Sequence, residues 1–281
     1  MDETREWTAA EAAALLRVPT AADDKYSRGV VGLRTGSALY PGAAVLGVEA
    51  AWRTGAGMVR YVGPARDLVL ARRPETVTVP GRVQAWVIGS GTSSAGRTAQ
   101  ESAALRSLLA GEAPVVVDAG ALDLVAPPVP GAQRAPLVLT PHDREHAALR
   151  SRLGLAAGPG RAAAALDTAA TLDAVVLLKG AVTVVASPDG GVRTVTTGVP
   201  WLATAGTGDV LAGILGAVLA GLGARQPDAG RLDLAAATAA LLHGRAAAAA
   251  SAAHSGGPVV ALEVAEAVAA EVGTLLARPA P

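Results

Sequence analysis

A chain of 281 residues, 51% of them hydrophobic, is long enough to bury a large core, and its 24 basic and 24 acidic residues balance, which argues against a polyanion-binding surface. It has no cysteine, so disulfides, thiolate metal sites and a cysteine nucleophile are excluded. The acidic N-terminus lacks the apolar core of a signal peptide, and no stretch makes a convincing membrane span. We therefore expect a soluble, cytoplasmic protein that binds neither nucleic acid nor membranes.

The predicted elements alternate between strands and helices along the chain. Thr8 and Glu11 have the spacing of a capping box, which predicts a short helix from Thr8 to Arg17. Further helices are predicted at 43–54, 66–71 and 95–109, from about 143, after 160, after 208, and at 234–253 and 262–276. Strands are predicted at 29–33, 58–62, 75–79, 86–88, 114–118, 136–140, 173–179, 182–186 and 192–196, the last two as a hairpin.

Short strands that are apolar throughout and separated by helices predict a mainly parallel sheet covered on both faces, and no repeat or composition break divides residues 1–281 into domains. In such sheets ligands bind beyond the carboxyl ends of the strands. Polar or glycine positions fall there repeatedly: Gly36, Ser37, Gly89, Gly91, Asp118, Thr140, His142, Lys179 and Asp209. Neither a complete dinucleotide fingerprint nor a Walker loop occurs, so the prediction depends on this convergence.

The segment Ala205-Gly206-Thr207-Gly208-Asp209 precedes an apolar run with helical spacing. Glycines at a helix start let the backbone approach a ligand, and the exposed amides and the helix dipole favour anions, phosphate above all. Asp209 does not fit a simple phosphate site. It is either a stabilising first-turn carboxylate or a base that removes a proton from a hydroxyl beside a bound phosphate.

Seven stretches carry a resemblance to a known family. They are 41–46, 53–57, 88–91, 117–119, 139–142 with Glu145, 178–183 and 203–211. In this order and spacing they resemble the ADP-dependent NAD(P)H-hydrate dehydratases, a branch of the ribokinase-like superfamily. The resemblance implies a single ribokinase-like domain with an α/β/α three-layer fold over 1–281, in the stand-alone form that lacks a fused epimerase. It also implies a homo-oligomer, with a tetramer as one expectation, and a separate epimerase in the same pathway.

The reaction implied by this resemblance repairs hydrated nicotinamide cofactors. The ring hydroxyl of NADH or NADPH hydrate is phosphorylated by ADP, or alternatively ATP, with Mg²⁺, and phosphate is then eliminated to leave NADH or NADPH, AMP and phosphate. Asp209 would be the base that acts on the hydroxyl, and we expect the helix dipole to keep it ionised. The amides of 205–208 would hold the transferring phosphoryl group.

The resemblance also assigns binding roles position by position. The implied nucleotide-binding residues are Lys179, Gly180, Ala181, Val182, Thr183, Gly206, Thr207 and Gly208. The implied substrate-binding residues are Ala43, Gly91, His142 and Asp209. Glu145 would orient a water bound to the magnesium ion.

Each assignment has a simpler alternative. Lys179 at a strand end is otherwise a solvated charge, and His142 a helix-capping residue. Glu145 is otherwise an ordinary first-turn glutamate, and Asp118 a structural acceptor. Two aromatic residues are candidates for stacking on a flat ring: Tyr40 and Trp201.

The chain departs from the family's motifs at three places. His142-Asp-Arg-Glu145 stands for His-Pro-Gly-Glu, Gly198-Val-Pro200 for Gly-Asn-Pro, and Ala205-Gly206 for two glycines. These departures keep open a catalytically idle nucleotide-binding protein. An ATP-dependent small-molecule kinase of the same superfamily, acting on a thiazole or pyrimidine alcohol, also stays open, because the Gly206–Asp209 helix start would serve either chemistry.

Overall fold

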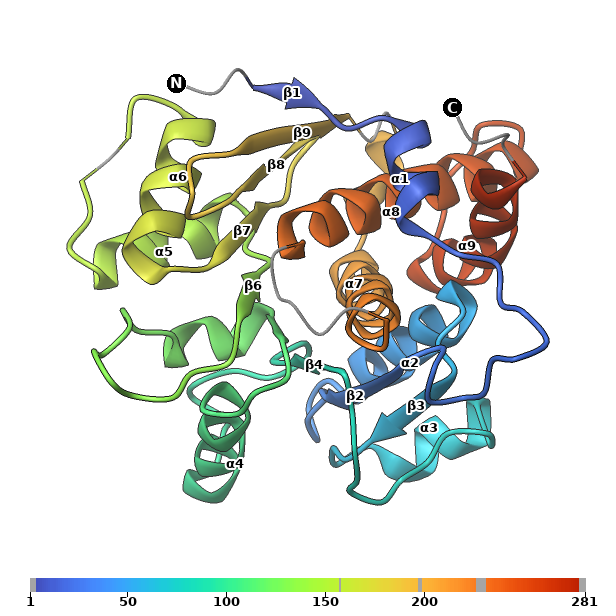
Figure 1. The fold of residues 1–281 in the computed structure, drawn as a ribbon, viewed down its shortest axis with the longest axis horizontal. Helices are drawn as coiled ribbons and strands as arrows, with labels where there is room; N and C mark the ends of the chain where they lie inside the picture. Colours follow the sequence, from blue (N-terminus) through green and yellow to red (C-terminus); the bar gives the residue numbers. More distant parts are fainter. Residues whose placement is uncertain (1–3, 157, 197–198, 226–230, 278–281) are drawn as a thin grey trace.

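The computed structural model describes residues 4–156, 158–196, 199–225 and 231–277. Within these ranges the strands form one nine-stranded sheet of order β1-β9-β8-β7-β6-β5-β4-β2-β3 (Figure 1). The strands are β1 (Arg5–Glu6), β2 (Val30–Arg34), β3 (Met58–Tyr61), β4 (Ala85–Ile88), β5 (Val115–Val117), β6 (Leu137–Leu139), β7 (Val175–Leu178), β8 (Val182–Ala186) and β9 (Val192–Thr196). All neighbours are parallel except β7–β8 and β8–β9, which are antiparallel. The mainly parallel sheet is therefore confirmed.

Helices cover both faces of this sheet. They are α1 (Ala9–Leu15), α2 (Gly42–Thr54), α3 (Arg66–Arg72), α4 (Ala99–Leu109), α5 (Asp143–Arg152), α6 (Arg161–Leu172), α7 (Thr207–Gly223), α8 (Leu232–Ala253) and α9 (Ala261–Leu276), with the 3₁₀ turns η1 (Ala119–Leu124) and η2 (Pro200–Leu202). Alternate residues of β5 belong to the two cores: Val116 is part of the core that includes residues of α1, α2, α3, α7, α8 and α9, whereas Val115 and Val117 are part of the core that includes residues of α4, α5 and α6. The three-layer α/β/α fold is thus confirmed.

The centre of the larger layer is α7, which is buried along most of its length. It contacts α2 so closely that a Cβ atom added at Gly213 would lie 2.3 Å from the carbonyl oxygen of Gly47. Only glycine permits this approach of two helix backbones. Because α2 and α7 begin at the same edge of the sheet, their contact fixes the spacing of their N-termini.

The structure confirms some predicted elements and corrects others. The capping box of Thr8 and Glu11 is formed, and both hairpin strands have the predicted bounds. The strand predicted at 75–79 is wrong, because only Val77 pairs, in an isolated bridge to Arg60. The Arg60 guanidinium donates a hydrogen bond to the carbonyl oxygen of Val79, so this group is engaged by a side chain instead of a neighbouring strand.

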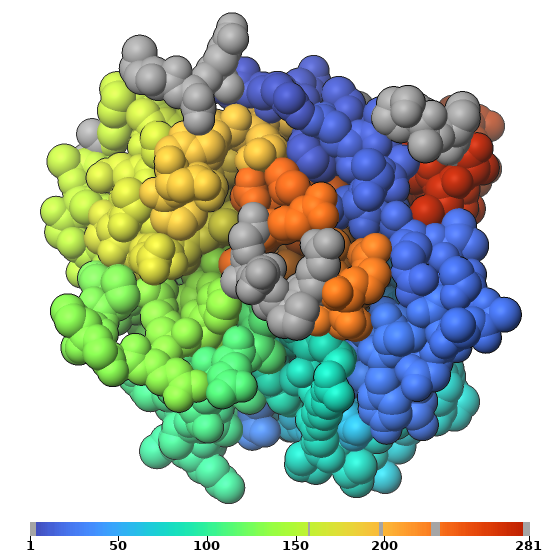
Figure 2. All heavy atoms as spheres, viewed as in Figure 1, coloured from blue at the N-terminus to red at the C-terminus, as the bar shows by residue number. Residues whose placement is uncertain are grey.

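Two further differences lie near helix α4 and the N-terminus. Helix α4 begins at Ala99 instead of 95, because the Thr98 side chain caps it. The two-residue strand β1 was not predicted; it pairs with β9 and leads into α1, which packs on α8 and α9. In the space-filling view this N-terminal segment (dark blue) lies between the hairpin (yellow) and the C-terminal helix (red) (Figure 2).

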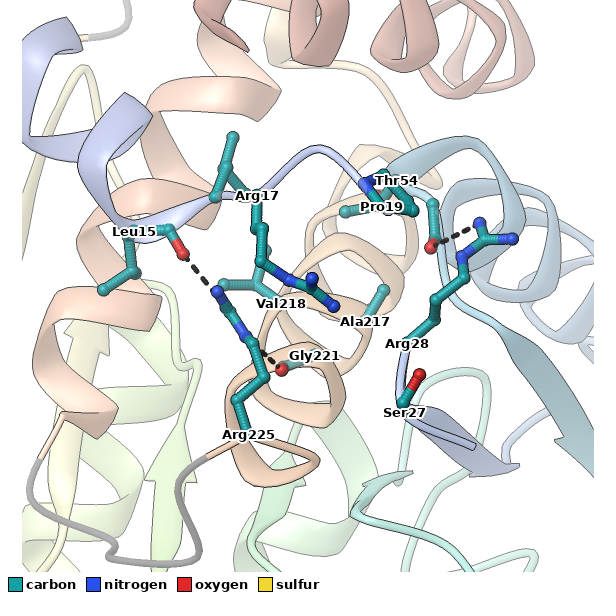
Figure 3. Close-up of a pocket in the computed structure, with 12 residues that line it drawn as sticks. Leu15, Arg17, Pro19, Ser27, Arg28, Thr54, Ala217, Val218, Gly221 and Arg225 are labelled. Carbon is teal, nitrogen blue, oxygen red and sulfur yellow. Dashed lines mark hydrogen bonds between the residues drawn. The ribbon is translucent and has the colours of Figure 1, made fainter. Parts of the chain in front are cut away.

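A small pocket of about 70 Å³ lies at the C-terminal end of α7 (Figure 3). Two of its arginines donate hydrogen bonds to carbonyl oxygens at helix ends: Arg225 to those of Gly221 and Leu15, and Arg28 to that of Gly55. These contacts are ordinary caps of helix C-termini. The third arginine, Arg17, pairs with Asp23. The pocket is therefore accounted for by the fold, and it lies at the opposite end of α7 from Asp209. No helix within the described ranges is long and apolar enough to cross a membrane.

Candidate active site

The centre of the candidate site is Asp118, which follows β5 directly and is 2% exposed. Its Oδ2 accepts a hydrogen bond from Ser90 Oγ at 2.8 Å, and its Oδ1 accepts one from Thr140 Oγ1 at 2.8 Å. Oδ1 also lies 3.0 Å from the Nζ of Lys179. Because Ser90, Thr140 and Lys179 come after β4, β6 and β7, one carboxylate joins the ends of four neighbouring strands.

Lys179 is held between two carboxylates. Besides Asp118, Glu145 approaches, with its Oε2 3.8 Å from Nζ. Burial lowers the pKa of Lys179, but the charges of Asp118, Glu145 and Asp209 together outweigh burial, and the net shift is upward. The side chain therefore stays a charged ammonium at the edge of the sheet and is not the solvated surface lysine of the simpler alternative.

Asp209 lies in the first turn of α7, whose N-cap is Gly206 with φ +91. Burial, followed by the charge of Asp118, raises the pKa of Asp209 to about 7, while Lys179 acts in the opposite direction. The expectation that the helix dipole keeps this carboxyl fully ionised is therefore wrong. A carboxyl with this pKa gains and loses its proton near neutral pH, which is the most effective range for a general base there.

The N-terminus of α2 contributes Ala43, which is buried against Gly91. A Cβ atom at Gly91, where φ is +67, would lie 2.5 Å from the Ala43 methyl group. One turn along α2, Leu46 packs against Gly206, since a Cβ there would lie 2.7 Å from Leu46 Cδ1. The structure thus brings the predicted substrate residues Ala43 and Gly91 to the helix that carries Asp209.

His142 and Glu145 form a capping box at the start of α5. The His142 Nδ1 accepts hydrogen bonds from the amides of Arg144 and Glu145 at 3.1 and 3.2 Å. In return, Glu145 Oε2 accepts one from the His142 amide at 2.8 Å. The simpler capping alternative is therefore present, but the His142 side chain stays 51% exposed, with its Nε2 3.6 Å from Glu145 Oε1. That nitrogen remains available to a ligand.

A cavity of about 630 Å³ opens beside Lys179 and the first turn of α7. This size is typical of pockets for ligands such as a nucleotide. Every predicted nucleotide residue lines it except Gly206, which packs near Leu46 and Ala261 instead. The lining residues are Lys179, Gly180, Ala181, Val182, Thr183, Thr196, Val199, Pro200, Leu202, Ala203, Thr207, Gly208, Leu211 and His243.

His243 of α8 lines this cavity and was not found by sequence reasoning. It is 7% exposed, its ring hydrogen-bonds the backbone at Thr207, and its Nε2 has no hydrogen-bond partner among the residues that the structure describes. Burial lowers the pKa of His243 to about 4, so the ring is neutral. Its position in an alanine-rich run offered no spacing signal that would link it to the glycine-rich turn before α7.

The metal prediction has limited support from the side chains. Within the parts of the chain that the structure describes, no three His, Asp or Glu side chains are grouped so that they could hold a metal ion. A magnesium ion commonly keeps several waters and takes one or two carboxylates plus substrate phosphates. The role of Glu145 through water therefore stays a prediction.

The remaining candidates lie outside the cavity. Tyr40 and Trp201 are exposed and do not line it, and Trp201 Nε1 donates to the Gly256 carbonyl oxygen at 3.0 Å. Gly198 falls outside the described residues. The altered Asp143 pairs with Arg161, with its Oδ1 2.9 Å from Arg161 Nε.

A sheet of this topology, with a helix N-terminus and a charged lysine at its carboxyl edge, defines a ribokinase-like fold. A family model described as NAD(P)H-hydrate dehydratase matches residues 31–269. The chain therefore belongs to the NAD(P)H-hydrate dehydratase family, as the motifs indicated.

Similar proteins support this assignment. The chain is 47% identical over 221 residues to the bifunctional NAD(P)H-hydrate repair enzyme Nnr of Mycobacterium tuberculosis, covering 75% of this chain and 45% of that protein. It thus spans less than half the length of that relative. It is 36% identical to the ADP-dependent (S)-NAD(P)H-hydrate dehydratase of Xanthomonas campestris, covering 75% of this chain and 78% of that protein.

Solved structures agree on the fold. The ADP/ATP-dependent NAD(P)H-hydrate dehydratase of Bacillus subtilis, co-crystallised with ATP and Mg²⁺, is 28% identical and superposes with a TM-score of 0.82 over 98% of this chain and 100% of that one. A ribokinase-like superfamily protein of Enterococcus faecalis, 23% identical, has a TM-score of 0.81 over 100% of this chain and 98% of that one, and so shares the fold.

Proposed function

We propose that this protein repairs hydrated NADH and NADPH by ADP-dependent dehydration, with release of AMP and phosphate. One observation carries the proposal: a carboxyl with a pKa of about 7, Asp209, stands at a helix N-terminus beside a nucleotide-sized cavity that contains a charged lysine. The family and the names of its members support the substrate.

The nucleotide occupies the cavity in this proposal. Its diphosphate lies between Lys179 and the first turn of α7, where a Cβ added at Gly208 would be 3.4 Å from the lysine Nζ. A small residue there leaves room for phosphoryl oxygens between an ammonium and the helix amides. The apolar residues Val182, Leu202 and Leu211 then cover the base. The same cavity is lined by Thr207 and by the other residues around the link between β7 and β8: Gly180, Ala181 and Thr183.

The hydrated dinucleotide lies on the other side of Asp209, against Ala43, Gly91 and His142. Asp209 takes the proton from the ring hydroxyl as the hydroxyl oxygen bonds to the β-phosphorus of ADP, and the bond to the AMP oxygen breaks. Loss of a ring proton and of the phosphate group then restores the double bond. The charge that spreads over the phosphoryl oxygens is stabilised by Lys179 and the amides before and at Gly208.

The feature that favours a magnesium ion in this site is its excess of carboxylates over cations. Asp118, Glu145 and Asp209 surround a single ammonium, so a cation would offset negative charge there. Glu145 would hold it through water, with phosphate oxygens as the other ligands. When bound, the ion would neutralise charge on the phosphates. The structure of the B. subtilis relative was co-crystallised with ATP and Mg²⁺, which supports this cofactor and leaves ATP as an alternative to ADP.

The proposal extends to the domain organisation, the oligomeric state, the localisation and an accompanying activity. We propose that residues 1–281 form one domain of a cytoplasmic homo-oligomer, with a tetramer as the expected state. We also propose that an epimerase activity accompanies this one, since relatives such as the M. tuberculosis enzyme are named bifunctional.

The deciding experiment incubates the protein with enzymatically hydrated NADH, ADP and Mg²⁺ and follows the absorbance of reduced nicotinamide. We expect absorbance to recover in step with release of AMP and phosphate. A stable phosphorylated product from a thiazole or pyrimidine alcohol with ATP would instead identify a kinase. Nucleotide binding without turnover of either substrate would identify an idle binding protein.

A further inference from the structure

Arg161, the first residue of α6, spans the link between β7 and β8. Its Nη1 donates to the Val182 carbonyl oxygen at 2.6 Å, and its Nη2 donates to the Lys179 carbonyl oxygen at 2.8 Å. A longer contact of 3.4 Å joins Nη2 to the Leu178 carbonyl oxygen. One rigid guanidinium therefore holds backbone groups on both sides of Gly180 and Ala181, which line the cavity.

The same guanidinium is anchored on a third element. Its Nε donates to Asp143 Oδ1 at 2.9 Å, and Asp143 is the first residue of α5, next to His142. This is the position where the chain departs from the His-Pro-Gly-Glu pattern. The altered residue, Asp143, thus supplies a carboxylate that orients Arg161 toward the link between β7 and β8. A guanidinium has several N–H donors in a fixed plane, so it can bond this carboxylate and the backbone carbonyl groups at the same time.

Gly180 leaves the space that the guanidinium needs. A Cβ atom added there would lie 2.5 Å from Arg161 Nη2 and 3.0 Å from its Cζ. Real Cβ atoms do not approach so closely, so even a methyl group would push the guanidinium away from its carbonyl partners. The absence of a side chain at Gly180 and the contacts of Arg161 therefore depend on each other.

We propose that Arg161 is a positioning residue for the nucleotide, which fixes the segment Lys179–Val182 in its binding arrangement before the ligand arrives. This inference rests on the proposed nucleotide role of the cavity. A segment held in one arrangement loses less conformational freedom on binding, so affinity is higher than for a loose segment. Its hydrogen bonds to described residues are to carbonyl oxygens and to Asp143, so Arg161 acts through the segment and not on the reacting groups.

The test measures ADP binding by calorimetry and steady-state repair of hydrated NADH with the full chain. We expect Arg161→Ala to raise the ADP Kd and KM about tenfold, in keeping with lost charged hydrogen bonds, and to change kcat by less than about threefold. Arg161→Lys should not restore affinity, because a single ammonium cannot span these carbonyls. Arg144→Ala is the matched control: it removes an equal charge from α5, and its side chain makes no hydrogen bond or ion pair within the described residues.

A double-mutant cycle with Gly180→Ala gives the sharper result. In the natural background Gly180→Ala should weaken ADP binding about as much as Arg161→Ala, and in the Arg161→Ala background it should add almost nothing. Additive losses, or normal ADP affinity in either single variant, would overturn the positioning role alone. If Arg161→Ala does not fold, the same cycle is run with Arg161→Lys in its place, because Gly180 itself lines the cavity and its single variant alone does not isolate Arg161. If the unsubstituted protein neither binds ADP nor repairs the hydrated cofactor, the proposed function is overturned as well.

Discussion

The Nζ of Lys179 lies 3.0 Å from Oδ1 of Asp118, although the two residues are 61 positions apart in the chain. The lysine that the resemblance assigned to the nucleotide is therefore already paired. This pairing orients the ammonium toward the first turn of α7, and the Asp118 charge also helps to raise the pKa of Asp209. One buried carboxylate thus affects both the proposed nucleotide contact and the proposed base.

Lys179→Met should weaken ADP binding more than tenfold, because it removes the cation that faces the phosphates. It should also destabilise the fold by about 3–5 kcal/mol, since Asp118 would stay buried without its partner. Calorimetric titration and urea unfolding measure the two effects. Lys25→Met, which removes the same charge from an exposed loop, is the control. Unchanged ADP affinity in Lys179→Met would show that the assignment is wrong.

Asp209→Asn should abolish repair of hydrated cofactor and leave nucleotide affinity within about threefold, because the amide keeps the shape of the side chain but cannot accept a proton. Initial rates and ADP titrations with the same preparation separate the two properties. Turnover near the natural rate would exclude Asp209 as the base.

The pH dependence of kcat/KM should report the Asp209 carboxyl. Its pKa of about 7 predicts an acid limb centred near pH 7, with activity lost as the pH falls, because the base must be ionised. Asp118→Asn removes a charge that raises this pKa, so it should move the limb to lower pH. A limb near pH 4 in the natural protein, or one that does not move in the variant, would contradict the electrostatic account.

The same pKa predicts a gain in stability for the inactive variant. The folded-state pKa of about 7 lies above the ordinary value of 3.8, so ionised Asp209 destabilises the fold. This penalty begins above pH 3.8 and is complete above pH 7, and asparagine does not carry it. At pH 8 the free energy of unfolding of Asp209→Asn should therefore exceed that of the natural protein by on the order of 2–4 kcal/mol, so the variant should unfold at a higher temperature, with little difference at pH 4. Thermal unfolding at several pH values measures this trend, and a constant difference would contradict it.

Gly213→Ala tests the approach of α2 and α7. The new methyl group would lie 2.3 Å from the Gly47 carbonyl oxygen, so the helices must move apart, at a cost of about 1–3 kcal/mol. Turnover should fall as well, because these helices carry Ala43 and Asp209. Gly273→Ala in α9, where nothing lies within 4 Å, is the control and should be neutral or stabilising by up to about 1 kcal/mol. Equal stability changes in the two variants would contradict the close approach.

Local chemistry decided which parts of the fold could be predicted. The Thr8–Glu11 capping box and the hairpin bounds follow from residues a few positions apart, and both are confirmed. The segment 75–79 has the alternation of a strand, but the Arg60 side chain takes a carbonyl group that the strand would need. The strand β1 is too short to leave a pattern.

The candidate site shows the same limit at longer range. The glycines and Asp209 could be recognised in the sequence because they follow one another at the start of a predicted helix. By contrast, the links of Asp118 to Lys179 and of Arg161 to Val182 join separate strands and helices, and neither has a sequence signal. The pKa of Asp209 was misjudged for a related reason: the dipole of its helix is visible in the sequence, whereas its burial depends on the packing of α2 and α7.

The reversal of direction at β8 has a practical consequence. Because β8 leaves the cavity at Val182 and runs to Ala186, the tight turn that follows lies at the far edge of the sheet, closed by the Ser187 amide and the Gly191 carbonyl oxygen. A fluorophore attached in that turn would lie at the opposite end of β8 from the cavity and would not contact a ligand bound there. The hairpin therefore offers a site for labelling or immobilising the protein that leaves the cavity free.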